Sequence, residues 1–498
     1  MTTKPTLSTL GQLKKSGYKP LSVKEEMRKN LIDSIRNKQN PFQGIEGYES
    51  TVIPQLQTAV LSRHNIILLG LRGQAKTRLA RLMLNLLDEW IPVVQGSEIN
   101  DDPLQPISRY ALDLIKEKGD KTPIEWLHRN DRYTEKLATP DVSISDLVGD
   151  VDPIKAASLK LHYNDERVIH FGLIPRSHRC IFVINELPDL QARIQVSLFN
   201  ILQEGDMQIR GFKLRLPLDV QFIFTANPED YTNRGSIVTP LKDRIDSQII
   251  THYPKTIEIA QKITSQEAKI TEEQKLSIEM PEILPVLIEQ IAMEARQSEL
   301  VDQKSGVSAR LTISAYENLY SFAERRLLLN EESKTRARLT DLFGAIPSIT
   351  GKVELVYEGE LEGAGNVALS LIGKAIRTVF TAYFPDPEKA KKSKKANPYA
   401  AILNWFNDGM DLKLGFESKL QDYEEALFKV EGLKELVAER FPGLGKEKQL
   451  VFMELVIYGL SEFSQLSRHS IAAGMEFKDL MSGMFSMNND EGFKLGEE

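Results

Sequence analysis

A short apolar run that leads through a glycine-containing turn into a helix constrains this chain more than any other segment. The run Asn65–Leu69 predicts a buried strand, and Thr77–Trp90 has the apolar spacing of a helix. The turn between them reads GLRGQAKT, residues 70–77. A strand, a turn and a helix in this order begin an α/β unit. Further apolar runs at 180–184, 220–225 and 247–252 alternate with helical patterns, which predicts a mostly parallel sheet covered on both faces.

The turn fits the phosphate-loop pattern G-x-x-x-x-G-K-[ST] at Gly70, Lys76 and Thr77. In such a loop, backbone N–H groups wrap a phosphate, the ammonium reaches the outer phosphates, and the hydroxyl holds Mg²⁺. Ala75 stands where the second glycine is expected, and alanine can serve there if its φ stays negative. A chance strand–turn–helix is the alternative. The predicted nucleotide-binding residues of the loop are Gly70, Leu71, Arg72, Gly73, Gln74, Ala75, Lys76 and Thr77.

A second apolar strand, Cys180–Ile184, is followed by Asn185 and Glu186. In phosphoryl-transfer sites one acid holds Mg²⁺ and another polarises the attacking water. Here Asn185 replaces the first acid, so we expect it to hold a metal-bound water without contributing charge. Glu186 is the candidate base. A strand that merely ends in polar residues is the alternative.

Three further segments place polar residues where they could complete such a site. Asn227 follows a strand and could orient the attacking water. Arg244, just past a helix, could reach the γ-phosphate of a neighbouring subunit. Arg310 opens a later helix and offers a second arginine to the nucleotide. Taken singly, each arginine is more often a surface salt-bridge partner.

In this order the motifs resemble those of AAA+ ATPases of the magnesium-chelatase ATPase subunit and MoxR group. Residues 41–47 are similar to that group's lead-in, whose Ile-x-Gly lines the adenine pocket, so the resemblance adds Ile45 and Gly47 to the nucleotide site. It implies a first sensor role for Asn227, a trans arginine-finger role for Arg244 and a second sensor role for Arg310. Because the spacing before Arg244 differs from that of chelatase subunits, Arg234 is a rival finger.

The resemblance implies an α/β fold: an AAA+ αβα sandwich with a parallel sheet, then an α-helical lid and a mainly helical C-terminal region. The expected domains are a basic N-terminal helical arm (1–40), the nucleotide-binding domain (41–255), the lid (256–345) and the helical C-terminal region (346–498) with a Lys-rich loop at 385–398. The arm is expected to be a solvated amphipathic helix, with contact to a partner or to nucleic acid as the alternative.

Composition bounds the partners and the compartment. The chain has 498 residues and a net charge of −7, which argues against a protein that coats nucleic acid by charge alone, so we expect no nucleic-acid partner. Its single cysteine, Cys180, excludes an intramolecular disulfide and any multi-thiolate metal site. The first 20 residues lack the apolar core of a signal peptide, and no apolar run approaches the length of a membrane helix. We therefore expect a cytoplasmic protein without a membrane span.

The leading hypothesis is an ATP-hydrolysing motor with ATP and Mg²⁺ as cofactors. By resemblance it would form a homo-oligomeric, hexameric ring and remodel a client, or load a metal, with a von Willebrand A-type partner. One alternative is a true magnesium chelatase subunit for metal insertion into a porphyrin. Others are a weakly hydrolysing nucleotide-binding scaffold, which Asn185 favours, and a motor that acts on DNA.

Overall fold

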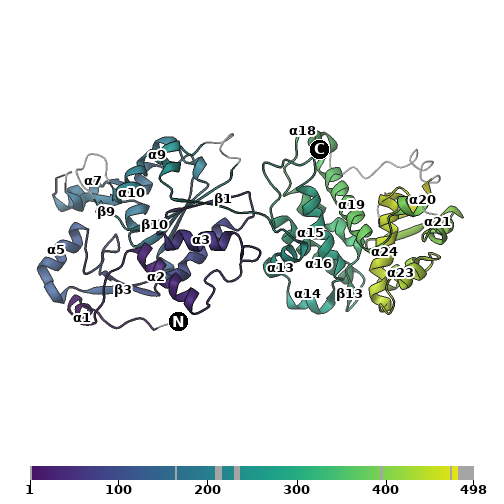
Figure 1. The fold of residues 1–498 in the computed structure, drawn as a ribbon, viewed down its shortest axis with the longest axis horizontal. Helices are drawn as coiled ribbons and strands as arrows, with labels where there is room; N and C mark the ends of the chain where they lie inside the picture. The colour runs from purple at the N-terminus through teal and green to yellow at the C-terminus, as the bar shows by residue number, and fades with distance from the viewer. Residues whose placement is uncertain are drawn as a thin grey trace. The chain divides into compact units, whose positions relative to one another are not determined.

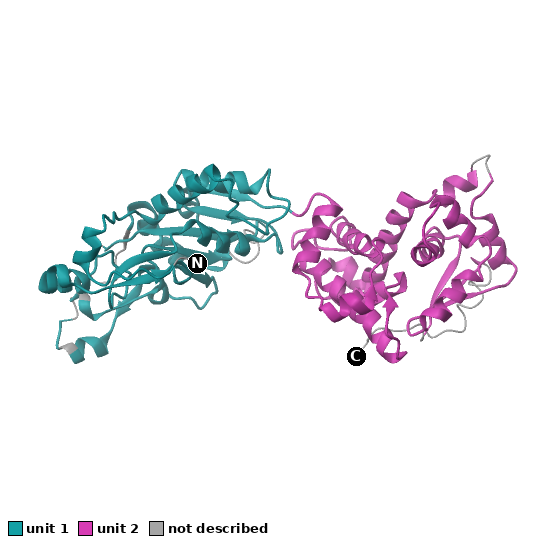
Figure 2. Ribbon diagram, turned by 90° about the horizontal axis from the view of Figure 1, so that it is seen from below, with its two compact units in different colours: residues 1–252 teal, residues 253–498 magenta. Residues whose placement is uncertain are grey.

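The computed structural model describes residues 3–162, 165–207, 216–228, 236–392, 396–471 and 474–480. The chain forms two compact units, residues 1–252 and residues 253–498 (Figure 2). Within the described ranges, no helix combines the length and the apolar character needed to cross a membrane.

The first unit combines helices with strands (Figure 1). The strands form one parallel sheet and several antiparallel two-stranded pairs. Its strands are β1 (Ile66–Leu69), β2 (Trp90–Val94), β3 (Ile124–His128), β4 (Tyr133–Leu137), β5 (Gly149–Val151), β6 (Ile169–Phe171), β7 (Cys180–Asn185), β8 (Asp206–Met207), β9 (Leu216–Pro217), β10 (Val220–Ala226) and β11 (Ser247–Ile250). Its helices are α1 (Leu10–Lys15), α2 (Val23–Arg36), α3 (Val52–Leu61), α4 (Lys76–Leu82), α5 (Arg109–Lys118), α6 (Ile144–Leu147), α7 (Pro153–Leu159), α8 (Leu173–Arg176), α9 (Ala192–Ser197), α10 (Phe199–Glu204) and α12 (Thr239–Asp243).

A five-stranded sheet organises this unit, in the order β11-β1-β10-β7-β4, and every pairing in it is parallel. Its three central strands, β1, β10 and β7, are buried along their whole length and mostly apolar because both faces are covered there. Alternate residues of β1 belong to two different cores: Ile66 and Leu68 pack with α2, α3 and α4, whereas Ile67 and Leu69 pack with α9 and α10. The predicted α/β sandwich with a parallel sheet is therefore confirmed.

Parallel pairing brings the carboxyl ends of the strands to one edge of the sheet, where ligands of open α/β folds bind. β1 leads into Gly70, β7 ends at Asn185, and β10 leads into Asn227. Since β10 lies between β1 and β7, the three predicted motifs become neighbours at this edge.

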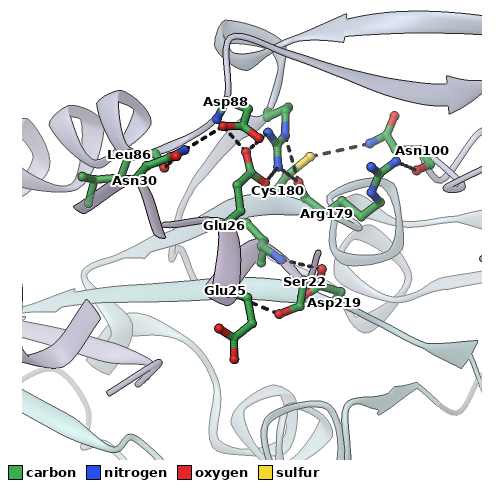
Figure 3. A network of polar contacts seen from close by, with 12 residues as sticks. Ser22, Glu25, Glu26, Asn30, Leu86, Asp88, Asn100, Arg179, Cys180 and Asp219 are labelled. Atoms are coloured by element: carbon green, nitrogen blue, oxygen red, sulfur yellow. Dashed lines mark hydrogen bonds and ion pairs between the residues drawn. The ribbon is translucent and has the colours of Figure 1, made fainter. Parts of the chain in front are cut away.

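The N-terminal segment differs from the predicted solvated arm. The apolar residues Val23, Met27 and Leu31 of α2 are buried in the core shared with α3 and β1. Glu26 is buried as well and forms a bidentate ion pair with Arg132, at 2.6 and 2.7 Å. Figure 3 shows Glu26 beside Asp88, and the backbone N–H of Val23 donates to Asp219 at 2.7 Å. The apolar spacing correctly indicated a helix, but the helix is part of the domain.

Other segments of the first unit refine the predictions. The helix expected over 77–90 ends at Leu82, continues as a 3₁₀ turn (Met83–Leu86), and is followed by β2. β2 pairs with β3 as an antiparallel ribbon that the sequence did not indicate. β4, the strand at one end of the main sheet, was also missed.

The second unit is mainly helical. Its helices are α13 (Ile257–Glu267), α14 (Glu272–Ser277), α15 (Ile283–Ala295), α16 (Arg310–Leu329), α17 (Ile346–Thr350), α18 (Tyr357–Glu362), α19 (Ala364–Tyr383), α20 (Pro387–Lys392), α21 (Ala400–Asn407), α22 (Leu420–Phe428), α23 (Leu433–Arg440) and α24 (Lys446–Glu462). Its strands are β12 (Ile278–Glu279), β13 (Thr335–Arg336), β14 (Leu412–Gly415), β15 (Ser467–Ile471) and β16 (Gly474–Lys478).

One apolar core runs through the second unit from Ile278 to Phe477. The segments 256–345 and 346–498 therefore share a core rather than forming two separate bodies. The expected Lys-rich loop at 385–398 contains a short helix, α20, because Asp386 caps it by accepting hydrogen bonds from the backbone N–H groups of Glu388 and Lys389. Residues 393–395 of that segment lie outside the described ranges.

Candidate functional site

The loop between β1 and α4 requires glycine at its start. The backbone N–H of Gly70 donates to the carbonyl of Ala226 on β10 at 3.1 Å, which fixes the loop against the neighbouring strand. A Cβ at Gly70 would collide with the side chains of Thr251 and Gln74. Only glycine therefore allows the backbone this close to β11.

Ala75 adopts a left-handed conformation, with φ +56° and ψ 19°, and Gly73 also has a positive φ, +74°. The condition under which alanine was expected to serve here, a negative φ, is therefore not met. The loop keeps the backbone path that a glycine would take, and alanine adopts it at a cost of about 1–2 kcal/mol. Unfavourable backbone conformations of this kind cluster at ligand-binding sites, where the surrounding structure maintains them.

Lys76 is buried, with 8% of its surface exposed. Its Nζ donates to the carbonyl oxygen of Leu71 at 3.1 Å and also to that of Gly70. The ammonium is therefore turned back into the loop rather than out to solvent. The Lys76 ammonium therefore lies within the loop whose backbone amides would enclose an anion.

Side chains from distant segments hold the loop in place. The Tyr48 hydroxyl contacts the carbonyl oxygens of Gln74, at 3.0 Å, and His252, at 2.8 Å. The Thr251 hydroxyl lies 2.7 Å from Oε1 of the buried Gln74. Ile45, which is buried, and Gly47, with φ +82°, directly precede Tyr48, so the predicted adenine-binding segment lies next to the loop. Sequence reasoning had not singled out Tyr48 or Thr251.

A directed set of hydrogen bonds joins Glu186 to Asn185. The backbone N–H of Glu186 donates to the Thr225 hydroxyl at 3.2 Å, and that hydroxyl donates to Oδ1 of Asn185 at 3.0 Å. Glu186 has φ +53°, a left-handed conformation that turns the chain sharply at the end of β7. Its side chain is half-buried at the same edge of the sheet as the loop.

A carboxylate on the neighbouring strand completes this set. Nδ2 of Asn185 donates to Oε1 of Glu135 on β4 at 2.5 Å. The other oxygen of Glu135 accepts from Arg81 of α4 at 3.0 Å and from the Tyr133 hydroxyl at 3.3 Å. Burial, together with the nearby Glu135 carboxylate, raises the pKa of Tyr133 above its ordinary value, so the phenol stays protonated and can donate. The sequence analysis did not include Glu135.

The remaining predicted residues lie in different places. Asn227 is buried directly after β10, between the β1 and β7 ends. The Arg244 guanidinium is held on α10, where Nε donates to Gln203 at 3.0 Å and the group lies 5.0 Å from the Phe199 ring centroid. Arg310 is exposed at the first position of α16, in the second unit. Arg234, the rival finger, lies outside the described residues.

The side-chain oxygen atoms near the loop suit Mg²⁺ only when a nucleotide supplies further ligands. The described residues contain no group of three or more His, Cys, Asp or Glu side chains that could hold a metal ion. Thr77 and Asn185 nevertheless offer hydroxyl and amide oxygens, Glu186 adds a carboxylate at the same edge, and the Glu135 carboxylate contacts Asn185 from the middle of β4. Mg²⁺ prefers such oxygens and is usually shared with substrate phosphates. The chemistry of the site therefore fits Mg·nucleotide rather than a metal ion held by protein alone.

Residues 124–245 match the family described as the AAA domain of the dynein-related subfamily. The matched segment lies within the first unit. It begins after the phosphate loop and covers β4, β7 and β10, with Glu135, Asn185 and Glu186, and it ends just after Arg244.

Several solved structures are similar to parts of the chain. NtrX from Brucella abortus in complex with ATP is 13% identical, over 59% of this chain and 53% of NtrX, with a TM-score of 0.33. A complex between subunits BchI and BchD of magnesium chelatase is 19% identical, over 64% of this chain and 98% of the matched chain, with a TM-score of 0.33. RuvB from Thermotoga maritima is 10% identical, over 78% of this chain and 98% of RuvB, with a TM-score of 0.34. The chain thus spans about half the length of NtrX. The assignment of the α/β fold therefore depends on the observed strand order and not on these similarities.

Proposed function

We propose that this protein is an ATPase that binds Mg·ATP at the carboxyl edge of the first unit's sheet and hydrolyses it to ADP and phosphate. The observation that carries the proposal is the buried ammonium of Lys76, turned into a glycine-started loop. Glu186 lies at the end of β7, in the same sheet. The match of residues 124–245 to an AAA domain supports the same function.

In this proposal each side chain has a separate task. Lys76 meets the outer phosphates, and the loop amides of residues 70–77 enclose them. The Thr77 hydroxyl and, through water, the Asn185 amide would hold Mg²⁺, which when bound would neutralise charge on the phosphates. Glu186 orients the attacking water and accepts its proton, while Asn227 fixes the water from the neighbouring strand. Ile45 and Gly47 contact the adenine.

We further propose that the protein acts as a ring of identical subunits. Arg244 is half-buried on the surface of α10, with its guanidinium held by Gln203 and Phe199. Those contacts orient it without a phosphate, as an arginine presented to the next subunit requires. The second sensor role of Arg310 is retained from the motif resemblance alone. A hexameric ring, membership of the magnesium-chelatase and MoxR group, a von Willebrand A-type partner and a client to be remodelled rest on the motif resemblance alone.

A nucleotide-binding scaffold with weak hydrolysis is the second candidate. The specific observation that favours it is the neutral amide at residue 185, whose oxygen and nitrogen already contact Thr225 and Glu135. The part of the chain that the structure describes offers no comparable observation for porphyrin binding.

The proposal is tested by ATP binding to the full chain. Lys76→Ala removes the ammonium that meets the outer phosphates, so calorimetry should show ATP binding at least about tenfold weaker, since charge-assisted hydrogen bonds contribute about 1.5–3 kcal/mol. Lys14→Ala is the matched control, because it removes an exposed lysine paired with Asp120 elsewhere in the same unit. Equal ATP affinity in wild type and Lys76→Ala would rule out the phosphate-loop assignment.

A further inference from the structure

The hydrogen bonds around Asn185 have only one consistent direction. The Thr225 hydroxyl accepts from the Glu186 N–H, so its own proton goes to Asn185 Oδ1. The amide nitrogen of Asn185 must then face Glu135, which as a carboxylate can only accept. Both polar atoms of the side chain are thus engaged, and the amide is fixed in one orientation at the end of β7.

This geometry explains why residue 185 carries an amide. Thr225, Asn185 and Glu135 occupy neighbouring strands β10, β7 and β4, on the sheet face that packs against α4. An aspartate at 185 could not donate to Glu135, and its oxygen would face the Glu135 carboxylate at 2.5 Å. Two carboxylates so close repel each other. A carboxylate on β4 and an amide on β7 are therefore a matched pair.

We infer that Glu135 supplies, from β4, the negative charge that the end of β7 lacks, and that it does so as a positioning residue acting through Asn185. Its carboxylate holds the Asn185 amide so that Oδ1 stays at the carboxyl edge, and it places a formal charge directly behind that amide. This inference rests on the proposed nucleotide function. It makes Glu135 a determinant of Mg²⁺ binding rather than a mere partner of Arg81.

Arg81 provides a second test, because removing it should not weaken Mg²⁺ binding, whereas removing Glu135 should. It lies on α4 four residues after Thr77, so the two side chains share one face of the helix. Its ion pair with Glu135 is open to solvent, with 65% of the Arg81 side chain exposed. Exposed pairs are weak, so Arg81 can leave Glu135 when a divalent cation binds nearby. As a cation beside the same carboxylate, Arg81 competes with Mg²⁺ for its charge.

The experiment measures the factor by which Mg²⁺ tightens nucleotide binding. Calorimetry gives the Kd of a non-hydrolysable ATP analogue for the full chain, once with excess Mg²⁺ and once with EDTA. The variants are Glu135→Gln, Asn185→Asp, the double variant Glu135→Gln/Asn185→Asp, and Arg81→Gln. Glu25→Gln is the matched control, because it removes a carboxylate from an exposed ion pair with Arg63 elsewhere in the unit.

Glu135→Gln should reduce the Mg²⁺ factor about tenfold or more, as expected when a group that orients a metal ligand is removed. The double variant should recover most of it, since it restores one carboxylate and one amide in exchanged positions. Arg81→Gln should not reduce the factor, and Glu25→Gln should match wild type. Thermal melts of each variant separate loss of folding from loss of Mg²⁺ coupling.

The inference is overturned if Glu135→Gln lowers the melting temperature but leaves the Mg²⁺ factor unchanged, because Glu135 is then only an ion-pair partner. It is also overturned if the double variant stays at the Glu135→Gln value, or if Arg81→Gln reduces the factor as strongly. A different result separates it from the proposed function. If wild type fails to bind the analogue, or if Lys76→Ala binds it equally well, the nucleotide site itself is wrong, and the inference falls with it.

Discussion

The buried ion pair between Glu26 and Arg132 offers a sharp test of how the N-terminal helix α2 contributes to the first unit. Glu26 Oε1 accepts from Arg132 Nη1 at 2.7 Å, and Oε2 accepts from Nη2 at 2.6 Å. Glu26 also accepts from the backbone N–H of Asp88 at 2.6 Å. The side chains of Arg132 and Glu26 are only 1% and 5% exposed. Glu26→Gln keeps the shape of the side chain but removes its charge.

The expected loss follows from the guanidinium that remains. Arg132 would stay buried, with the carbonyl of Arg179 as its other partner at 3.0 Å. Breaking one side of a buried pair costs about 3–5 kcal/mol, because an uncompensated charge is left behind. For a unit of this size each kcal/mol lowers the melting temperature by about 2–4 °C, so a loss of about 3 kcal/mol gives about 6–12 °C.

The neighbouring residue supplies the control. Glu25 lies on the same helix and pairs with Arg63 at 2.6 Å, but the two side chains are 41% and 52% exposed. Such pairs contribute about 0–1 kcal/mol, so Glu25→Gln should shift the melting temperature by at most about 4 °C. Scanning calorimetry of the full-length variants measures both shifts. If the two variants melt within about 2 °C of each other, α2 is not anchored by this pair and the burial argument is refuted.

Three further predictions concern the loop, the base and acid stability. Ala75→Gly relieves about 1–2 kcal/mol of left-handed strain in the folded state against about 0.4–1 kcal/mol of added chain entropy, so scanning calorimetry should show a melting temperature that is unchanged or raised by a few degrees, and a clearly lower melting temperature would contradict the strain argument. Glu186→Gln should leave nucleotide bound but slow phosphate release by about 10²-fold or more; equal rates in wild type and variant would favour the scaffold. Burial, aided by Arg179, lowers the pKa of His178 from 6.5 to about 4, so as the pH falls below 6.5 the unfolded chain takes up the proton first and stability is lost down to about pH 4. His178→Gln should flatten that part of a plot of melting temperature against pH, and an unchanged slope would refute the assignment.

Much of the first unit could be predicted because its central strands are continuous apolar runs followed by polar residues. β1, β7 and β10 each leave a polar or glycine residue at the carboxyl end, and parallel pairing brings those ends together. Gly70, Lys76, Asn185 and Asn227 could therefore be grouped at one edge before any coordinates were known. The N-terminal helix was also predicted, but its burial was not, because a basic composition hid the buried acid Glu26.

What the sequence by itself determined is the order of the motifs, the α/β class and the loop that leads into Lys76, because these depend on neighbours along the chain. Only the tertiary structure decided that Ala75 is left-handed and that Asn185 has a carboxylate beside it. Glu135 lies 50 residues before Asn185 in the chain, on β4, at one end of the sheet order. A strand at the end of a sheet needs no continuous apolar run, so no local pattern marked it. The contact between the two side chains exists because parallel strands β4 and β7 pair in one register, and that register is a property of the folded sheet.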